Sequence, residues 1–232
     1  AERQASEDRL RRFLADASHE LRTPLASIRG YAELFRLGAA EDPQTLESSM
    51  RRIEDESRRM GELVEDMLTL ARLDELRDTV REPVDVAKLA ADAVADARAT
   101  APDREIELRA NGNAIVSADP QQLRQVAGNL LRNALVHTDP GTPIEVDVGS
   151  DDVNVTLGVR DHGRGLPPDV DPEQLFQRFW RTEGGRTRGR GGAGLGLAIV
   201  SEIVAAHHGV VEADNAADGG AHFTVRLPRA LS

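Results

Sequence analysis

The chain has 232 residues, of which 30% are charged, and its formal net charge is −11. This acidic balance disfavours nucleic-acid binding, and the absence of cysteine excludes disulfides and thiolate chemistry. Lys88 is the only lysine, which excludes a P-loop because that motif ends in an obligatory lysine. The length fits a small element followed by one domain of ordinary size. No apolar run reaches the length of a transmembrane helix and no signal peptide opens the sequence, so the abrupt charged start fits an excised soluble part of something longer.

A long amphipathic helix is expected over about residues 2–37, because apolar residues recur every seven positions as in a coiled-coil seam. The main register contains Leu14, Leu21, Ile28 and Phe35. In this register His19 lies farthest from the seam, with Glu20 beside it and Thr23 one turn later on the same face. Pro24 removes a backbone hydrogen bond at mid-helix, so we expect a kink there.

Two interpretations of His19 are open from this stretch alone. One is an idle histidine on a solvated face. The neighbouring Glu20 and Thr23, followed by the kink at Pro24, favour the other, a histidine with a function.

A second helix is expected over about residues 44–74, after a turn in which Gly38 ends the first helix and Asp42-Pro43 begins the next. Its expected seam consists of Leu46, Met50, Ile53, Ser57, Met60, Val64, Met67 and Ala71. Two long helices joined by a short turn form an antiparallel hairpin, which alone buries too little apolar surface. Both helices carry further apolar residues beside the seam, namely Leu25, Leu34, Leu63 and Leu70. Pairing of two hairpins into a dimeric four-helix bundle is the natural solution.

The sequence pattern changes at residue 83, after a polar stretch at 75–82, from long helices to shorter helices and strands. The expected helices in this part cover about residues 86–99, 120–137, 176–180 and 194–208. The expected strands cover about residues 106–110, 114–118, 144–148, 153–159, 210–213 and 222–227, with Asn111-Gly112-Asn113 as the turn between the first two. The Gly- and Arg-rich segment at 182–192 is expected to be mobile. This order indicates an α+β sandwich, so the chain divides into a helical unit at 1–76 and an α+β domain at 83–232.

A polar stripe follows one face of the expected helix at 120–137. Asn129, Asn133 and His137 are spaced four residues apart and therefore share that face. Asparagine is a mediocre helix former, and a merely solvated face would more typically use Glu, Lys or Arg. Amide oxygens are able to ligate Mg²⁺, which usually brings phosphates with it. The stripe is thus either an exposed polar face or part of a phosphate site.

A carboxylate is expected at the end of the strand at 153–159. Val153, Val155, Leu157 and Val159 alternate toward the interior, and Asp161 continues that parity. A buried carboxylate is costly unless it is hydrogen-bonded, and an exocyclic amine such as adenine N6 would provide the donor. Gly163 and Gly165 would let backbone approach a flat ring. The alternative is an aspartate that only caps the turn before a glycine loop.

A glycine-rich string at 189–196 precedes the expected helix at 194–208, and helix N-termini bind anions. The string satisfies G-x-G-x-x-G, but no strand precedes it and no βαβ unit surrounds it, which excludes a Rossmann site. A flexible linker is the alternative, although linkers seldom run straight into an apolar helix. A lid over phosphate is therefore favoured. His207 and His208 are adjacent and cannot share a helix face, so we expect no metal site at these two residues.

Five segments together resemble the bacterial two-component sensor histidine kinases, and the likeness covers nearly the whole chain. They match, in the family's order and spacing, the H box (FLADASHELRTP, Phe13–Pro24), the N box (NLLRNALVHT, Asn129–Thr138), the first glycine box (DHGRG, Asp161–Gly165), the phenylalanine box (LFQRFWR, Leu175–Arg181) and the second glycine box (GAGLGL, Gly192–Leu197). The fold that this resemblance implies is an all-α helical hairpin, which forms a dimeric four-helix bundle, followed by an α+β sandwich of the GHKL or Bergerat type that binds ATP.

The resemblance implies a role for each residue of the first motif. His19 is the expected phosphoacceptor, and Glu20 is expected to hydrogen-bond its ring and act as general base. Thr23 is expected to orient a water that dephosphorylates the partner. Pro24 is expected to supply a kink that lets the bundle move.

The resemblance also implies the residues around ATP and Mg²⁺. Asn133 is the expected Mg²⁺ ligand, with Asn129 beside it near the phosphates, and Asp161 is the expected reader of adenine. The second glycine box is expected to cradle phosphate. The full implied set of cofactor-binding residues is Asn129, Asn133, His137, Asp161, Gly163, Gly165, Arg178, Gly192, Gly194, Leu195 and Gly196.

The N box departs from the family pattern. Val136 and His137 stand where many members have Lys and then Tyr or Phe, so one cation that faces phosphate is missing. Gln125 stands where the family usually has an acidic residue. The candidates to replace the missing cation are His137, Arg186, Arg188 and Arg190.

The expected function is ATP-dependent autophosphorylation of His19, phosphotransfer to an aspartate of a response regulator, and dephosphorylation of that regulator. The expected partners are a second copy of the chain and the regulator's receiver domain, without nucleic acid. The resemblance implies the cytoplasmic portion of a membrane sensor, attached only through a missing N-terminal region. A catalytically weak dimeric scaffold that binds nucleotide is the alternative, and a GHKL ATPase of another kind ranks last because it leaves His19, Glu20 and Thr23 unexplained.

Overall fold

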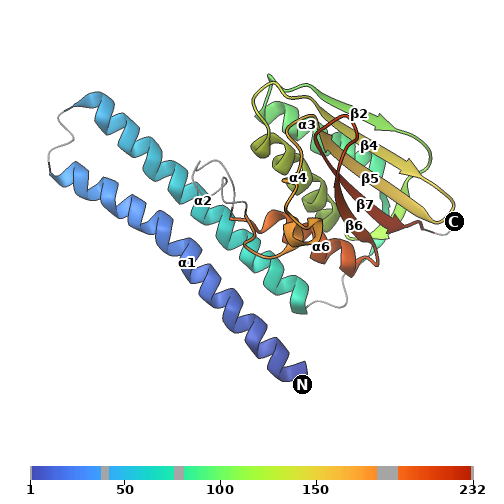
Figure 1. The fold of residues 1–232 in the computed structure, drawn as a ribbon, viewed down its shortest axis with the longest axis horizontal. Helices are drawn as coiled ribbons and strands as arrows, with labels where there is room; N and C mark the ends of the chain where they lie inside the picture. Colours follow the sequence, from blue (N-terminus) through green and yellow to red (C-terminus); the bar gives the residue numbers. More distant parts are fainter. Residues whose placement is uncertain (1, 38–41, 76–80, 182–192, 231–232) are drawn as a thin grey trace. The chain divides into compact units, whose positions relative to one another are not determined.

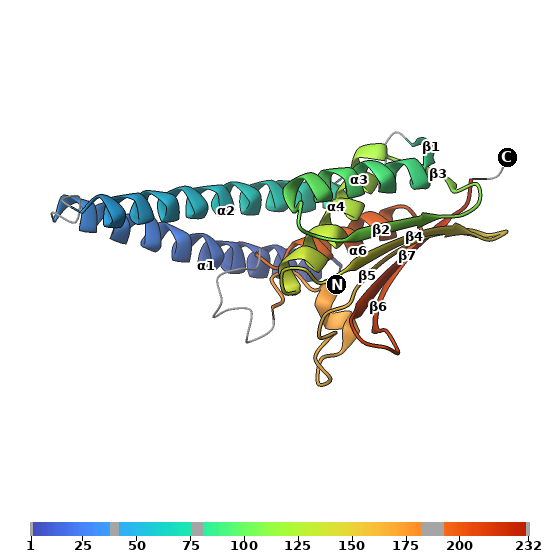
Figure 2. The same ribbon diagram turned by 90° about the horizontal axis from the view of Figure 1, so that it is seen from above.

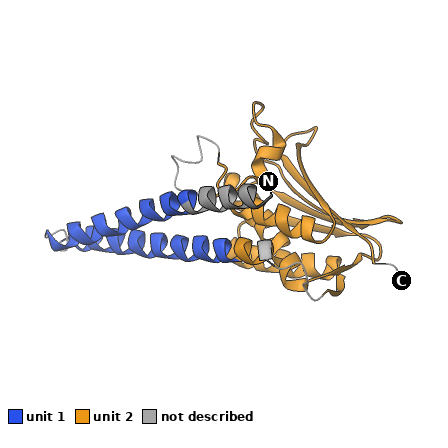
Figure 3. Cartoon of the chain, turned by 90° about the horizontal axis from the view of Figure 1, so that it is seen from below, with its two compact units in different colours: residues 1–68 blue, residues 69–232 orange. Residues whose placement is uncertain are grey.

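Residues 2–37, 42–75, 81–181 and 193–230 are described by the computed structural model (Figure 1). Internal contacts divide the chain into two compact units, residues 1–68 and residues 69–232 (Figure 3). In the described part of the chain, no helix combines the length and the apolar character needed to cross a membrane.

The first unit is the expected helical hairpin. Helix α1 spans Glu2–Arg36 and continues through Pro24, and α2 spans Pro43–Glu75 and extends into the second unit. The side chain of Asp42 caps α2 by accepting hydrogen bonds from the backbone N–H of Gln44 and of Thr45, at 3.3 and 3.1 Å. These bonds, together with the Thr45 hydroxyl as the largest cause, lower the pKa of Asp42. The Asp-Pro helix start is therefore confirmed.

The packed side of α1 agrees with the predicted seam over its described side chains. Ala17 and Pro24 are buried, and Leu21, Ile28 and Tyr31 are half-buried. Phe35, which the seam also included, is 46% exposed, so the seam does not extend to the end of the helix.

The predicted seam of α2 is wrong for half of its residues: Met50, Ser57, Val64 and Ala71 are exposed, whereas Leu46, Ile53, Met60 and Met67 are half-buried. Leu63, expected beside the seam, is only 4% exposed, whereas Met50 and Val64, expected in it, are 38% and 42% exposed. The reason is that α2 is apolar on two neighbouring columns, and periodicity alone does not tell which column faces α1. Large apolar side chains that stay exposed on this hairpin are Leu25, Leu34, Phe35, Leu37, Met50, Val64 and Leu68.

The second unit is a two-layer α+β sandwich. Its helices are α3 (Val86–Thr100), α4 (Pro120–His137), the 3₁₀ helix η2 (Pro172–Phe176) and α6 (Gly196–Ala206). Its strands are β1 (Glu82–Asp85), β2 (Ile106–Ala110), β3 (Ile115–Ala118), β4 (Ile144–Ser150), β5 (Asn154–Asp161), β6 (Val210–Asn215) and β7 (Ala221–Pro228). Five strands form a sheet in the order β2-β4-β5-β7-β6, and α3, α4 and α6 cover one of its faces (Figures 1 and 2).

Strand pairing differs from the sequence prediction in one respect. The segments at 106–110 and 114–118 do not form a hairpin: β2 pairs with β4 in parallel, and β3 pairs with β1 in a separate two-stranded sheet. The remaining neighbours in the large sheet are antiparallel. The Asn-Gly-Asn turn indicated a hairpin locally, but the long-range pairing overrides it.

Two local expectations are also corrected. The helix expected at 176–180 is instead the 3₁₀ helix η2, which Asp171 caps through the N–H of Glu173 at 3.0 Å. Val153 is 69% exposed because β5 starts after it, although Val155, Leu157 and Val159 are buried as predicted.

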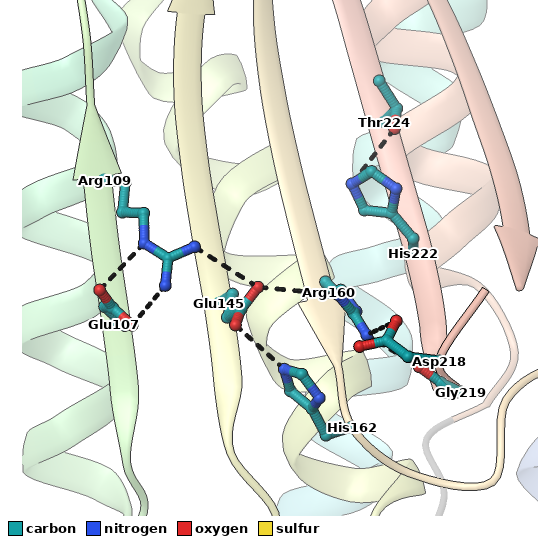
Figure 4. A network of polar contacts seen from close by, with 9 residues as sticks. All are labelled: Glu107, Arg109, Glu145, Arg160, His162, Asp218, Gly219, His222 and Thr224. Carbon is teal, nitrogen blue, oxygen red and sulfur yellow. Dashed lines mark hydrogen bonds and ion pairs between the residues drawn. The ribbon is translucent and has the colours of Figure 1, made fainter. Parts of the chain in front are cut away.

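The face of the sheet opposite the helices is polar. Arg109 pairs with Glu107 at 2.8 Å, and His162 Nε2 lies 3.2 Å from Glu145 Oε1 (Figure 4). Arg160 reaches Glu145 at 4.0 Å and also pairs with Asp218 in the turn between β6 and β7 (Figure 4). Strand alternation thus separates a helix-covered apolar face from a charged outer face.

His207 fastens α6 to the start of α4. It is 4% exposed; its Nδ1 lies 2.8 Å from Ile203 O, and its Nε2 accepts the backbone N–H of Asp119 at 3.0 Å. Because Nε2 faces a donor, the ring is neutral with its proton on Nδ1. Burial, as the largest cause, lowers the pKa of His207 below 6.5.

We expect the contribution of His207 to stability to be complete above about pH 6.5, where the unfolded imidazole is also neutral. As the pH falls through that value, the unfolded chain takes up a proton first, so the free energy of unfolding decreases. Urea unfolding at about pH 7.5 and about pH 5.5 measures this loss.

His207→Gln is expected to lower the free energy of unfolding by about 1–3 kcal/mol at the higher pH and to reduce its pH dependence. The exposed neighbour His208, replaced by Asn, is the control; an equal pH dependence in H207Q and H208N would contradict the assignment.

Candidate functional site

Asp161 lies at the end of β5 with its carboxylate on the helix-covered side of the sheet. It is 5% exposed, as the strand alternation predicts. Its Oδ1 accepts the N–H groups of Gly163 and Ala221, at 2.8 and 3.3 Å. Its Oδ2 has no hydrogen-bond donor among the described residues, so one oxygen remains able to accept a donor from a ligand.

The loop after Asp161 lies tightly against the end of α4. A Cβ atom at Gly163 would lie 2.7 Å from Thr138 Cγ2 and 2.8 Å from Asp161 Oδ1. Only glycine fits there without displacement. The first glycine box and the end of the N box, 23 residues apart in the sequence, are therefore in contact.

Asn129 connects the N box with the second glycine box. Its Nδ2 donates to Gly196 O at 3.1 Å, and its Oδ1 accepts from Arg132 Nη2 at 3.3 Å. Asn133, one turn later, is half-buried, and its side chain makes no hydrogen bond to a described residue. The amide of Asn133 is thus available to a ligand, whereas that of Asn129 already holds the start of α6.

His137, at the end of α4, has a lowered pKa. The first cause is the desolvation of its ring and the second is the charge of Arg181, while Asp161 acts in the opposite direction. These interactions place the N box, the phenylalanine box and the first glycine box around one site. The lowered pKa favours the neutral ring in the chain without ligand, and His137 as the replacement for the missing cation stays a prediction.

The phenylalanine box contacts Gly194 of the second glycine box and the helix α6 that follows it. Phe179, with a positive φ of 62°, donates its N–H to Gly194 O at 3.0 Å. A Cβ atom at Gly194 would lie 2.7 Å from Trp180 O, and its φ is 77°, so this position requires glycine. Arg178 forms an ion pair with Glu202 of α6 at 3.1 Å.

The second glycine box is described only from residue 193 onward. Gly192 and the lid arginines Arg186, Arg188 and Arg190 lie outside the described residues. Leu195 was expected among the ligand-binding residues, but its side chain is fully buried at 0% exposure, so only its backbone is available. Among the described residues no side chain caps α6, so none of them occupies the N–H groups of its first turn, which suit an anion.

Three contributors to this site escaped the sequence reasoning: Arg104, Glu202 and Asn215. Arg104 donates to Leu135 O at 2.9 Å, to Thr138 Oγ1 at 2.7 Å and to Asp139 O at 2.6 Å, and so closes the end of α4. A lone arginine, glutamate or asparagine belongs to no motif and no period, so the sequence carried no signal for them.

In the first unit, His19 and Thr23 are exposed on α1 and Glu20 is half-buried. This agrees with the predicted register. No hydrogen bond joins His19 to Glu20 in the described part of the chain.

A hollow of about 280 Å³ lies on the outer face of the sheet. Arg109, Asp147, His222 and Thr224 are among the residues that line it. It contains none of the predicted site residues, and it lies on the face that the helices leave open. We therefore place the candidate site between α4, α6 and the end of β5.

Two family models match the chain. Residues 9–76 match the His Kinase A (phospho-acceptor) domain, and residues 118–231 match the histidine kinase-, DNA gyrase B-, and HSP90-like ATPase. The probable sensor histidine kinase TcrY of Mycobacterium tuberculosis is 47% identical over 228 residues, which are 97% of this chain and 47% of TcrY. The sensor histidine kinase TrcS of Mycobacterium tuberculosis is 45% identical over 237 residues, which cover 98% of this chain and 45% of TrcS. The chain thus spans about half the length of these two curated relatives.

Solved structures agree. The mycobacterial sensor histidine kinase MprB is 30% identical, with a TM-score of 0.57 over 66% of this chain and 100% of the solved chain. The histidine kinase ThkA, solved in complex with the response regulator protein TrrA, has a TM-score of 0.81 over 98% of this chain and 64% of its own, at 21% identity, and therefore supports the fold alone. The helical hairpin followed by an α+β ATPase sandwich is confirmed, and the chain belongs to the sensor histidine kinase family.

Proposed function

We propose that this chain is the kinase core of a two-component sensor: it binds ATP, phosphorylates His19 and passes the phosphoryl group to an aspartate of a response regulator. The observation that carries the proposal is Asp161, a buried carboxylate with one oxygen held by two backbone donors and the other left for a ligand. A carboxylate in that state selects a ligand that presents an amino group.

Adenine fits this requirement. Its exocyclic amine donates to Asp161 Oδ2, and Gly163 lets backbone lie close to the ring plane. The phosphates lie toward the uncapped first turn of α6, where Gly196 begins the helix. Base recognition and phosphate binding thus come from two elements that α4 holds together through Asn129.

Asn133 is the proposed ligand of Mg²⁺. Its amide has no hydrogen-bond partner among the described residues, and it lies one turn from Asn129, which contacts the start of α6. The described residues contain no cluster of three or more His, Cys, Asp or Glu side chains suited to a metal ion. An ion held by one amide and by nucleotide phosphates fits these donors, and it would neutralise developing phosphate charge.

His19 is the proposed nucleophile. One ring nitrogen attacks the γ-phosphorus of ATP, a P–N bond forms, the bond to the bridging oxygen breaks, and ADP leaves. Glu20, the next residue, accepts the hydrogen bond and the proton of the other ring nitrogen. Exposure of His19 suits a residue that must meet both a nucleotide and a second protein.

The hairpin is proposed to dimerise. Leu25, Leu34, Phe35, Met50 and Val64 stay exposed on one hairpin. A second copy that covers these side chains would complete a four-helix bundle. We place the phosphotransfer domain at 1–76 and the catalytic domain at 83–232, and the family matches at 9–76 and 118–231 support that division.

A response regulator is the proposed acceptor, supported by the solved complex of ThkA with the response regulator TrrA. We propose that this chain is the cytoplasmic portion of a membrane sensor; its relatives TcrY and TrcS are sensor histidine kinases of about twice this length. Thr23 is the proposed residue that orients water for dephosphorylation of the regulator.

A nucleotide-binding scaffold without phosphotransfer is the second candidate. The altered N box favours it, because Val136 and Gln125 replace charged residues of the family pattern and the pKa of His137 is lowered. The two functions differ in one observable: the scaffold binds an ATP analogue but leaves His19 unmodified.

Phosphorylation of His19 is tested with ATP labelled at the γ-phosphate. The chain is expected to acquire label that is acid-labile and base-stable, as for a P–N bond. His19→Gln is expected to abolish the label, while the control Arg22→Gln on the same helix retains it. Label that survives in H19Q would refute the assignment of His19.

The role of Asp161 is tested by Asp161→Asn. The amide oxygen still accepts the N–H groups of Gly163 and Ala221, so the fold is retained, but the amide nitrogen then faces the adenine amine. We expect the Kd for an ATP analogue to rise about tenfold to a hundredfold in calorimetry. The exposed Asp152→Asn serves as the control, and unchanged affinity in D161N would place adenine elsewhere.

Thr23→Ala tests the phosphatase assignment. Thr23 is exposed, so its removal is expected to leave folding and autophosphorylation within about twofold of the wild type. Dephosphorylation of a regulator that the chain itself has phosphorylated should slow by about tenfold or more. Phosphotransfer time courses against candidate regulators supply the substrate. Equal loss of both activities would argue against a specific role for Thr23.

A further inference from the structure

The side-chain amide of Asn215 holds the backbone of Leu166. Asn215 is the last residue of β6, and Leu166 lies in the irregular loop after β5. The Oδ1 atom accepts the Leu166 N–H at 2.6 Å, and the Nδ2 atom donates to Leu166 O at 3.2 Å. One amide thus satisfies both polar groups of one backbone residue, as a neighbouring strand would do.

This contact requires the second glycine of the DHGRG segment. A Cβ atom at Gly165 would lie 2.4 Å from Asn215 Oδ1, and the φ of Gly165 is 75°. A larger residue there would be strained and would also displace the amide. The approach to Asn215 therefore accounts for glycine at this position, and the role of Gly165 in the approach of a ligand stays a prediction.

The hairpin that carries Asn215 also holds Asp161. Ala221, on the far side of the turn, donates its N–H to Asp161 Oδ1 at 3.3 Å. A Cβ atom at Gly220 would lie 1.7 Å from Asp161 O, so the turn lies directly against the end of β5. On the outer face, Arg160 bonds to Asp218 and to Gly219 O in the same turn (Figure 4). The turn between β6 and β7 is thus fixed to β5 on both faces of the sheet.

We propose that Asn215 is a positioning residue of the nucleotide site: it fixes the 163–166 loop to the same hairpin that orients Asp161. The inference rests on the proposed binding of ATP by Asp161. The loop itself has no regular structure, so without the amide of Asn215 it samples more conformations. A nucleotide would then have to order the loop on binding, which weakens affinity without changing the groups near the transferred phosphoryl.

The test compares Asn215→Ala with the wild-type chain in calorimetry with an ATP analogue and in autophosphorylation. The Kd and the KM for ATP are expected to rise about tenfold, while kcat at saturating ATP stays within about twofold. Hydrogen exchange at the Leu166 amide is expected to accelerate, because its acceptor is lost. Asn215→Asp keeps the shorter bond to the Leu166 N–H, so its Kd should lie between those of the wild type and N215A. N215D also remains informative if N215A folds poorly.

Glu212→Gln is the matched control. Glu212 lies on the same strand and pairs with Arg226, away from the loop, so E212Q should leave the Kd and the Leu166 exchange unchanged. Wild-type affinity in N215A, or unchanged Leu166 exchange, would overturn the role of Asn215. Failure of the wild-type chain to bind the analogue would instead overturn the proposed function, and the two failures are therefore distinguishable.

Discussion

A buried carboxylate is the constraint on which the second unit depends. Strand alternation places Asp161 on the apolar side of β5, where an unpaired charge would cost several kcal/mol. Two backbone N–H groups meet this requirement, from Gly163 in the following loop and from Ala221 across the turn between β6 and β7. Both donors lie in irregular or terminal backbone, so their positions must themselves be held. The glycines, Arg160 and Asn215 supply that support.

The sequence predicted the elements with strong local signals. The bounds of α4 agree with the prediction, because Asp119 caps it, Pro120 opens it and one face is apolar throughout. The orientation of Asp161 also followed from period-two alternation. The strand partners could not be predicted in the same way. Strand β2 pairs with β4, although α4 lies between them in the sequence, and no local signal indicates that pairing. The prediction of the α2 seam was partly wrong for a related reason. Two neighbouring columns of apolar residues run along the helix, and only the fold determines which of them is buried.

The candidate site shows the same division. The motifs named the residues with distinctive chemistry, such as Asn129 and Asp161, and the fold brings their elements together. The residues that hold these motifs in place are of common types, and their spacing in the sequence forms no recognisable pattern. Arg104 caps α4 and Asn215 holds a loop only because the chain folds back to them. The residues that recognise a ligand can thus be predicted from a single sequence, whereas the residues that hold them in place depend on long-range contacts.

The two ends of α6 show how that support reaches the ligand site. At its start, Gly196 O accepts from Asn129 on α4; at its end, His207 accepts from the N–H of Asp119, which begins α4. The two helices are therefore antiparallel, and α6 is held at both of its ends to the start and the middle of α4, which restricts sliding of α6 along α4. Because a helix N-terminus attracts phosphate only where its N–H groups point, a fixed axis for α6 would fix the direction of phosphate binding at the proposed site. The neutral His207 is part of this constraint although it lies at the opposite end of α6 from the proposed phosphate site.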